Sequence, residues 1–491
     1  MENLGANCAG ARAAPPAASP ALRKFVVAAG VLAAALFIVV GLAFDLQTYG
    51  DGSIFSYGVA TREVWAFHWH NIATRAATYA LTLAPGEIVA AVTGSPFAGV
   101  FVYGLCLFAA PAVSLAATYA LDRAAGRPYF VAACAAVALL CPFVFGFPTE
   151  MWIAEALFWP AFACAMTMPV SFLSSALLVA LTSALALAHE GGLVLGFGMV
   201  VATALRGLRD ARFLRALASY ALAVAAWLAV NQFARPDSYF GEVRLRAASE
   251  FFEAKIFASP ALLLIVAVLA AYAVLCAPLS RVAKRRAPRI AALIVAAALV
   301  VWWSLLDRAL HADNRYYLRT VLLIGTCAFA AVVGLVQLAG EDTIVARIAP
   351  LARSLDALRS ETFARAAIGA VALVVLAHGV ETTKFVLGFA AYRAAVRALA
   401  MGEASDPELG ASFLVSSQRI GDDLNRLSWF STTLYLTAVV ADFKPKRLVV
   451  DPKGNYFWLS CATATEAARA QRVVPEKTRE MIRVYSCLHR D

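Results

Sequence analysis

The chain has 491 residues, of which 62% are apolar and only 15% carry a charge. Soluble globular proteins have about 45–50% apolar and about 25% charged residues, so this composition excludes a soluble fold, a disordered chain and a small disulfide scaffold. The net charge of +10 is typical of basic residues retained at the cytoplasmic ends of membrane helices. The sequence contains no basic stripe interleaved with aromatic residues, so nucleic-acid binding is not predicted. The sequence therefore predicts an all-α polytopic membrane protein whose immediate partners are membrane lipids.

Residues 1–24 are rich in Ala and Pro and are predicted to form a disordered cytoplasmic tail. The first apolar run, 25–44, is long enough to span a hydrocarbon core of about 30 Å, and we expect it to be a retained signal anchor. Ten further apolar runs follow, at 97–121, 128–147, 152–168, 171–188, 191–205, 214–233, 260–279, 290–306, 317–338 and 366–380. We therefore expect about 11 transmembrane helices, within a range of roughly 10–13, in a domain over residues 25–382.

The charges between the runs predict the orientation. Under this assignment the basic loops 122–127, 206–215, 281–289 and 340–365 share the side of the basic N-terminus. Because Lys and Arg concentrate in cytoplasmic loops, that side is predicted to be cytoplasmic. An odd number of spans then places the C-terminus on the outer side.

Two regions are predicted to lie outside. The long first loop, 45–95, contains an amphipathic part at 72–92 that we expect to lie along the membrane interface. From Lys384 onward 26 of 108 residues are charged, against 48 of 383 before it, which predicts a small α+β extracytoplasmic domain over 383–491. The segments 447–450 and 456–459 are predicted strands of a hairpin, separated by the turn residues 451–455.

Nine cysteines are present, but the sequence contains no CxxC motif that would indicate a zinc or redox site. Cys461 and Cys487 are the only ones in the predicted outer domain. In an oxidising compartment they are predicted to form a disulfide, with two free thiols as the alternative.

The strongest candidate for chemistry is Asp51, in the sequence Tyr49-Gly50-Asp51-Gly52 just beyond the first span. A carboxylate at this position can deprotonate an acceptor hydroxyl or hold a metal ion. The alternative is an ordinary glycine-flanked turn. His68 and His70 follow in an aromatic-rich segment; on a strand they would share one face and provide half of a metal site, and otherwise they belong to an interfacial aromatic belt.

Three other polar groups lie at the ends of predicted spans, where ionisable residues are expensive. His189-Glu190 separates two apolar runs and either binds a phosphate-bearing head group or forms a solvated helix end. Arg308, Arg315 and Tyr316 lie between the ninth and tenth spans, where a planar guanidinium suits a lipid phosphate and snorkelling is the alternative. Glu150 is a possible accessory to the same outer surface.

This pattern resembles the integral-membrane glycosyltransferases of the GT-C class. Those enzymes have a cytoplasmic N-terminus, roughly ten to thirteen spans, a long first outer loop with amphipathic helices and often an outer C-terminal domain. The resemblance places Asp51 at their catalytic acidic position, with Asp45 as the alternative. It also places His189-Glu190 and Asn314-Arg315-Tyr316-Tyr317 where such enzymes hold the lipid carrier. Because the more usual acidic pair is absent at Asp51, use of a divalent metal stays open.

The resemblance implies transfer of a sugar from a polyprenyl-phosphate carrier to an acceptor on the outer face of a bacterial inner membrane. Asp51 would be the base, and Arg315, with Arg308 or His189, would stabilise the departing phosphate. A lipid or solute transporter is the first alternative, although transporters usually place ionisable residues at midspan. A noncatalytic membrane assembly protein is the second.

Overall fold

The structure is a computed structural model that describes residues 19–62, 73–233, 259–282, 287–306, 318–339, 360–402, 414–429 and 432–450. Each of the eleven predicted apolar runs falls on a helix. These are α1 (Pro20–Ala43), α6 (Pro96–Leu121), α7 (Pro128–Leu139), α8 (Glu150–Thr167), α9 (Phe172–Ala186), α10 (Glu190–Ala204), α11 (Ala211–Phe233), α13 (Pro260–Val282), α14 (Ala287–Leu306), α15 (Arg319–Leu338) and α18 (Glu361–Met401). The first helix begins five residues before the predicted run, at Pro20, within the segment predicted to be a disordered tail.

Within the described residues, six helical segments are long and apolar enough to cross a membrane: Pro20–Ala43, Ala76–Thr93, Pro96–Leu121, Ala211–Phe233, Arg319–Leu338 and Glu361–Met401. Five of them coincide with predicted spans. The sixth contains α4 (Ala76–Thr78), the π-helical η3 (Tyr79–Leu83) and α5 (Ala84–Thr93), and it falls in the segment predicted to lie along the interface. Of the remaining predicted spans, α7, α9 and α10 are shorter apolar helices, and α13 and α14 contain the apolar stretches 262–275 and 293–302. The chain is thus helical, with the features of a multi-pass membrane protein.

Local sequence sets where several helices begin. The Oγ of Ser95 accepts a hydrogen bond from the backbone N–H of Ala98 at 3.2 Å, which caps α6. Ser171 and Ser174 form a capping box at the start of α9. Such caps satisfy backbone donors that have no partner within the helix, and here they mark helix starts inside an otherwise continuous apolar sequence.

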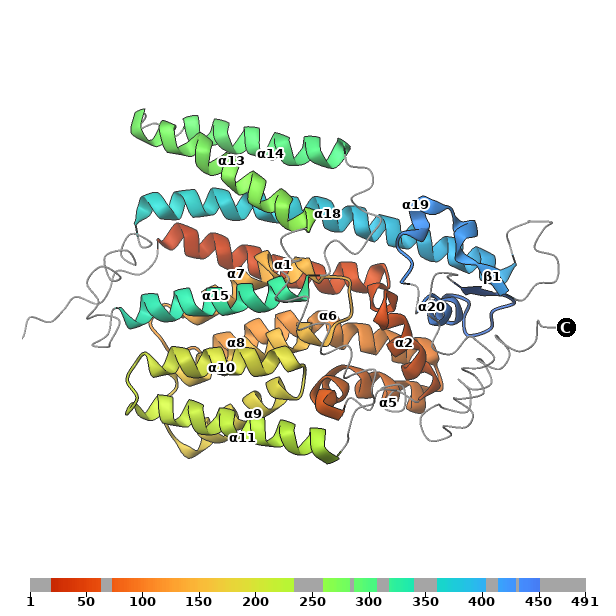
Figure 1. Ribbon diagram of the computed structural model, residues 1–491, viewed down its shortest axis with the longest axis horizontal. Coiled ribbons are helices and arrows are strands. Elements are labelled where there is room, and N and C mark those ends of the chain that lie inside the picture. Colours follow the sequence, from red (N-terminus) through yellow and green to blue (C-terminus); the bar gives the residue numbers. More distant parts are fainter. Residues whose placement is uncertain are drawn as a thin grey trace, which may run out of the picture.

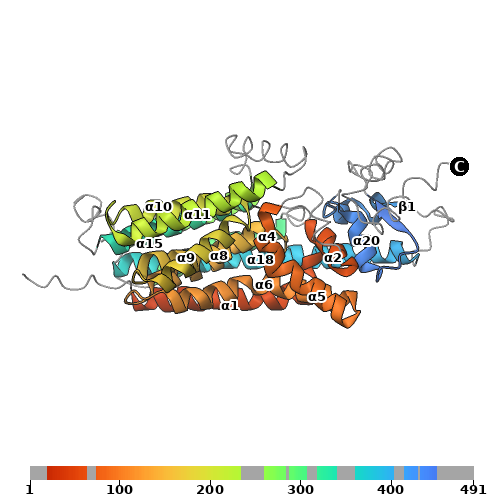
Figure 2. The same ribbon diagram turned by 90° about the horizontal axis from the view of Figure 1, so that it is seen from below.

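The long helices lie roughly side by side along the longest axis of the molecule (Figure 1). The central helix α8 is buried along nearly its whole length and packs against α6, α9 and α10. The pair α13 and α14 packs at one side against α18. The views in Figures 1 and 2 agree that α2 (Asp51–Thr61), α5 and α20 (Thr433–Val440) lie together at one end, and that α1 starts at the opposite end.

Basic residues gather at the end where α1 starts. A Cβ at Gly126 would lie 3.6 Å from Arg23 Nη1, so the turn between α6 and α7 lies beside the beginning of α1. The backbone N–H of Arg123, in that turn, donates to Thr167 Oγ1 near the end of α8 at 3.0 Å. Arg212, at the start of α11, donates from Nη1 to the carbonyl of Met166 at 3.0 Å. The basic loops 122–127 and 206–215, two of those used to predict orientation, therefore share one end of the bundle.

The C-terminal elements pack onto the other end. The helix α18 runs without a break across the boundary predicted after residue 382 and ends at Met401. Beyond it lie β1 (Leu414–Ser416), η7 (Ser417–Ile420), α19 (Asp422–Asn425), α20 and β2 (Leu448–Val450). The two strands pair in parallel, with Leu414 opposite Leu448. One predicted strand is thus present in β2, whereas 456–459, Cys461 and Cys487 lie outside the described residues.

These C-terminal elements share the bundle's hydrophobic core. Val415, Leu436 and Val449 belong to the same buried cluster as residues of α1, α6 and α8. The α2 helix contacts α20 directly: the rings of Tyr57 and Tyr435 are 5.5 Å apart. The C-terminal segment therefore covers α2, the helix that begins with Asp51.

Candidate functional site

Asp51 is the first residue of α2, in a turn that only glycine can form readily. The chain leaves α1, passes through the short helix η1 (Leu46–Thr48) and reaches Gly50, whose φ is +52° and ψ is −130°. L-residues with a side chain rarely adopt this conformation, and a Cβ at Gly50 would also lie 2.7 Å from the Phe147 ring. The Cα of Gly52 packs against the carbonyl of Gln47 and against Pro148, so that no space remains for the methyl group of an alanine. Both glycines therefore fix the position of Asp51, which starts a helix rather than forming an exposed loop.

The surroundings of Asp51 oppose its ionisation. Burial and the negative charge of Glu150 raise its pKa to about 6, although the nearby positive charges of Arg319 and Arg75 act in the other direction. The α2 helix is not one of the spanning helices, so the carboxyl lies at the end of the bundle. A carboxylate whose pKa is near neutral can accept a proton at physiological pH and later release it.

Arg75 links three separate elements beside Asp51. It lies at the end of η2 (Ala73–Arg75), its Nη1 donates to Glu150 Oε1 at 2.7 Å, and its Nη2 donates to Glu190 Oε2 at 3.1 Å. The three side chains are only 12–23% exposed. Burial opposes the charge of Arg75, but the two carboxylates outweigh it and raise the pKa of Arg75. Because Glu150 and Glu190 are the first residues of α8 and α10, this arginine ties the ends of two core helices to the segment after α2.

His189 caps α10 as a neutral side chain. Its Nδ1 accepts a hydrogen bond from the backbone N–H of Gly191 at 2.9 Å, and its Nε2 lies 3.8 Å from Glu190 Oε2. Burial and the positive charge of Arg75 lower the pKa of His189 to about 4. At neutral pH the imidazole can therefore donate one hydrogen bond from Nε2, but it does not supply a positive charge.

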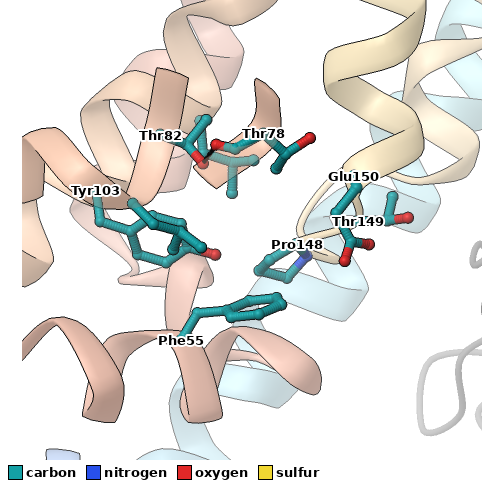
Figure 3. Close-up of a pocket in the computed structure, with 9 residues that line it drawn as sticks. Phe55, Thr78, Thr82, Tyr103, Pro148, Thr149 and Glu150 are labelled. Atoms are coloured by element: carbon teal, nitrogen blue, oxygen red, sulfur yellow. Dashed lines mark hydrogen bonds between the residues drawn. The ribbon is translucent and has the colours of Figure 1, made fainter. Parts of the chain in front are cut away.

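A small pocket opens between α2, α6 and the start of α8. It is lined by Phe55, Thr78, Thr82, Leu83, Tyr103, Leu107, Pro148, Thr149 and Glu150. It contains about 220 Å³ of empty space, including its open mouth. Figure 3 shows the Tyr103 hydroxyl and the Glu150 carboxylate pointing toward the same space, with Phe55 and Pro148 beside it. The pocket is thus mainly apolar, with a few polar groups directed into it.

The structure brings several of the predicted site residues together. Asp51, His189, Glu190 and Glu150 all lie in the group organised by Arg75. Asp45 does not join them: it pairs with Arg393 of α18, with Oδ2 and Nη2 2.9 Å apart. This pairing gives Asp45 a role in joining the end of α1 to α18.

The other predicted site residues lie outside the described residues; they are His68, His70, Arg308, Arg315 and Tyr316. Arg319, which begins α15 shortly after Arg315, acts electrostatically on both Asp51 and His189.

Three side chains of the site were not predicted. Arg75 stands in an amphipathic segment, where its charge is a weak signal, and Arg319 lies at the start of the predicted span 317–338, where basic residues are common. Tyr103 lies within an apolar run, and its sequence context carries no signal at all. Among the described residues, no three His, Cys, Asp or Glu side chains lie close enough together to hold a metal ion. In comparisons with known proteins, no protein-family model and no curated protein matches the chain.

Proposed function

We propose that the chain is a membrane glycosyltransferase that moves a sugar from a polyprenyl-phosphate carrier to an acceptor hydroxyl, with Asp51 as the general base. The observation that carries the proposal is the partly buried Asp51 carboxyl at the start of α2, with a pKa raised to about 6 and an adjacent pocket. Perturbed carboxyl groups beside a pocket are typical of general acid–base sites.

The proposed reaction is a displacement at the anomeric carbon of the sugar. The acceptor oxygen forms a bond to that carbon while the bond from the carbon to the phosphate oxygen breaks. The acceptor proton passes to Asp51, and the bonding electrons leave with the polyprenyl phosphate. A positioned base of this kind typically contributes ~100-fold to ~10,000-fold to the rate.

The departing phosphate needs positive charge close to the bond that breaks. Arg75 bridges Glu150 and Glu190, so we assign it to positioning these helix ends. Arg319 is the other described arginine, besides Arg75, that acts on both Asp51 and His189. We propose that Arg319, together with Arg315, Arg308 and Tyr316, stabilises the phosphate, and that His189 contributes a hydrogen bond.

We also propose that the N-terminus is cytoplasmic and that the end containing Asp51 faces the outer side of a bacterial inner membrane. The basic residues at the opposite end of the bundle support this orientation, because cytoplasmic loops are enriched in Lys and Arg. The polyprenyl carrier would then approach laterally from the membrane, and the acceptor from the aqueous phase.

The experiment that tests the function separates chemistry from transport. The purified chain is reconstituted into phospholipid vesicles that contain polyprenyl-phosphate hexoses and short glycoside acceptors, and the lipids are analysed by mass spectrometry. An enzyme releases free polyprenyl phosphate and extends the acceptor. Translocation of intact carrier across the bilayer without cleavage would contradict the proposal and indicate a flippase, and the absence of both would indicate a noncatalytic role.

A further inference from the structure

Tyr103 of α6 presents a hydroxyl group in surroundings that do not satisfy it. Its side chain is only 1% exposed, and within the described part of the chain its hydroxyl has no hydrogen-bond partner. Buried polar groups are nearly always paired, so each exception needs an explanation such as a bound ligand or water. Asp51 and Glu150 both act electrostatically on this hydroxyl, which places it beside the proposed catalytic carboxylate.

The unpaired hydroxyl points into the pocket described above. Glu150 projects its carboxylate toward the same space (Figure 3). Two of the three threonine protons at the rim are already used: Thr78 Oγ1 donates to the carbonyl of Ala188 at 3.1 Å, and Thr82 Oγ1 donates to that of Thr78 at 2.8 Å. The third threonine, Thr149, accepts at Oγ1 from the backbone N–H of Met151 at 3.4 Å. Tyr103 therefore supplies a hydrogen-bond donor or acceptor to whatever enters, and Glu150 supplies an acceptor.

The chemistry and size of the pocket point to one kind of group. A hydroxyl is both a donor and an acceptor, so a single hydroxyl can donate to Glu150 and accept from Tyr103. The walls formed by Phe55, Leu107 and Pro148 suit the C–H faces of a sugar. The enclosed space holds about one group of the size of a water molecule, which suits a single hydroxyl and excludes a whole sugar.

We propose that this pocket binds a hydroxyl or hydroxymethyl arm of a sugar, held between the Tyr103 hydroxyl and the Glu150 carboxylate. The inference rests on the proposed function for the identity of the substrate, since either the sugar on the carrier or a sugar acceptor can supply that arm. Tyr103 acts as a binding residue that selects a sugar by one of its hydroxyl groups.

The test measures binding to the full chain in phospholipid nanodiscs, so that no glycoside detergent competes. Three probes are compared: a farnesyl-phosphate hexose, farnesyl phosphate without sugar, and an octyl hexoside without phosphate. The variant Tyr103→Phe removes only the hydroxyl. The control is Tyr220→Phe, whose hydroxyl donates to the carbonyl of Leu193 at 3.0 Å in the contact between α11 and α10.

We expect Tyr103→Phe to weaken the binding of a sugar-bearing probe by about 10- to 100-fold. This is the typical effect of losing one hydrogen bond to a hydroxyl that also donates to a charged carboxylate. Binding of farnesyl phosphate should not change, and Tyr220→Phe should behave like the wild type toward all probes. The unliganded Tyr103→Phe protein should melt no lower than the wild type, because the lost hydroxyl is unpaired. A purely structural tyrosine would instead lower the melting temperature.

A series of monodeoxy sugars identifies the hydroxyl that enters the pocket. The deoxy probe that lacks this hydroxyl should bind the wild type and Tyr103→Phe equally. If Tyr103→Phe weakens the binding of the farnesyl-phosphate hexose alone, the pocket holds the donor sugar. If it weakens the binding of the octyl hexoside, the pocket holds the acceptor.

Two results would overturn the proposal: a wild type that binds no sugar-bearing probe, or a Tyr103→Phe variant that binds every probe as tightly as the wild type. The second result includes the case in which the pocket holds only water. If the octyl hexoside binds in a Tyr103-dependent way and no carrier is cleaved in vesicles, the sugar pocket stands while the proposed transferase function fails.

Discussion

At the scale of single residues, Asp51 and Glu150 are coupled carboxyl groups with different surroundings. Burial raises the pKa of Asp51 to about 6, and the charge of Glu150 adds to the effect, whereas Glu150 is itself paired with Arg75 at 2.7 Å. One carboxyl is thus suited to exchange a proton, and the other is held in an ion pair. Placing two carboxyl groups in different environments is a general means of giving them different roles.

This coupling predicts how the pH dependence of the reaction responds to a neutral residue at position 150. A general base must be deprotonated, so activity should rise as the pH increases through about 6, following the pKa of Asp51. Glu150→Gln removes a negative charge that raises this pKa, so the acidic limb of the kcat/KM profile should move to lower pH. The control Glu87→Gln, in α5, should leave the limb in place. An unchanged limb in Glu150→Gln, or one moved to higher pH, would show that Glu150 does not act on the base.

Arg75 provides a second prediction, because it neutralises two partly buried carboxylates at once. Removing one partner of a buried ion pair leaves uncompensated charge, which typically destabilises a protein by about 3–5 kcal/mol. Arg75→Ala should therefore lower the melting temperature strongly. Arg365→Ala removes the exposed pair with Glu361, in which both side chains are more than half exposed, and should have no measurable effect. Equal melting temperatures for both variants would contradict the structural role assigned to Arg75.

At the scale of elements, the start of α2 depends on close packing that a single methyl group would disrupt. A Cβ at Gly52 would overlap the carbonyl of Gln47 and the ring of Pro148, so Gly52→Ala must displace the turn that places Asp51. Misplacing a catalytic group by about 1 Å can reduce the rate by roughly 100-fold. We therefore expect Gly52→Ala to reduce transfer by about that factor.

The matched control is Gly379→Ala, inside α18, where a new Cβ would have no neighbour within 4 Å among the described atoms. Alanine favours a helix by roughly 1 kcal/mol over glycine, so this variant should be at least as stable as the wild type and fully active. Wild-type transfer rates in Gly52→Ala would mean that α2 tolerates displacement and does not position the base.

The helices could be predicted from sequence because apolar length alone identifies them, even where no amphipathic period is present. The position of α2 could not, because Gly-Asp-Gly fits a loop and a helix start equally well. Whether these residues start a helix depends on how they pack against Phe147 and Pro148, which are distant in the sequence. Arg75 was missed for a similar reason, since its partners Glu150 and Glu190 are 75 and 115 residues distant. The boundary predicted after 382 marks where the charge density rises, yet it falls inside one continuous helix.

At the scale of the whole molecule, the start of α2 and the basic loops 122–127 and 206–215 lie at opposite ends of the bundle (Figures 1 and 2). With the basic end in the cytoplasm, as proposed, the site and the C-terminal elements face outward. A reporter enzyme that is active only in the cytoplasm should therefore be silent when fused after Asp491 and active when fused before Met1. Activity at both ends would require an even number of spans and would move the site to the cytoplasmic side.

The central claim is that Asp51 is the base of a glycosyl transfer, and its most direct test is to compare Asp51→Asn with Asp45→Asn in the vesicle assay. Asparagine preserves the size of the side chain but does not accept a proton, so Asp51→Asn should lose ~100-fold to ~10,000-fold in transfer rate. Asp45 pairs with Arg393, away from the site, so Asp45→Asn should keep its activity.

The same variant distinguishes lost chemistry from lost folding. The pKa of Asp51 in the folded protein, about 6, exceeds its ordinary value of 3.8, so ionisation destabilises the fold increasingly from about pH 4 to about pH 6 and fully above it. Asp51→Asn should therefore melt at a higher temperature than the wild type at pH 7.5 and at a similar one at pH 4. An inactive but more stable Asp51→Asn beside an active Asp45→Asn is the predicted result. Wild-type transfer by Asp51→Asn, or an active Asp51→Asn with an inactive Asp45→Asn, would contradict the account.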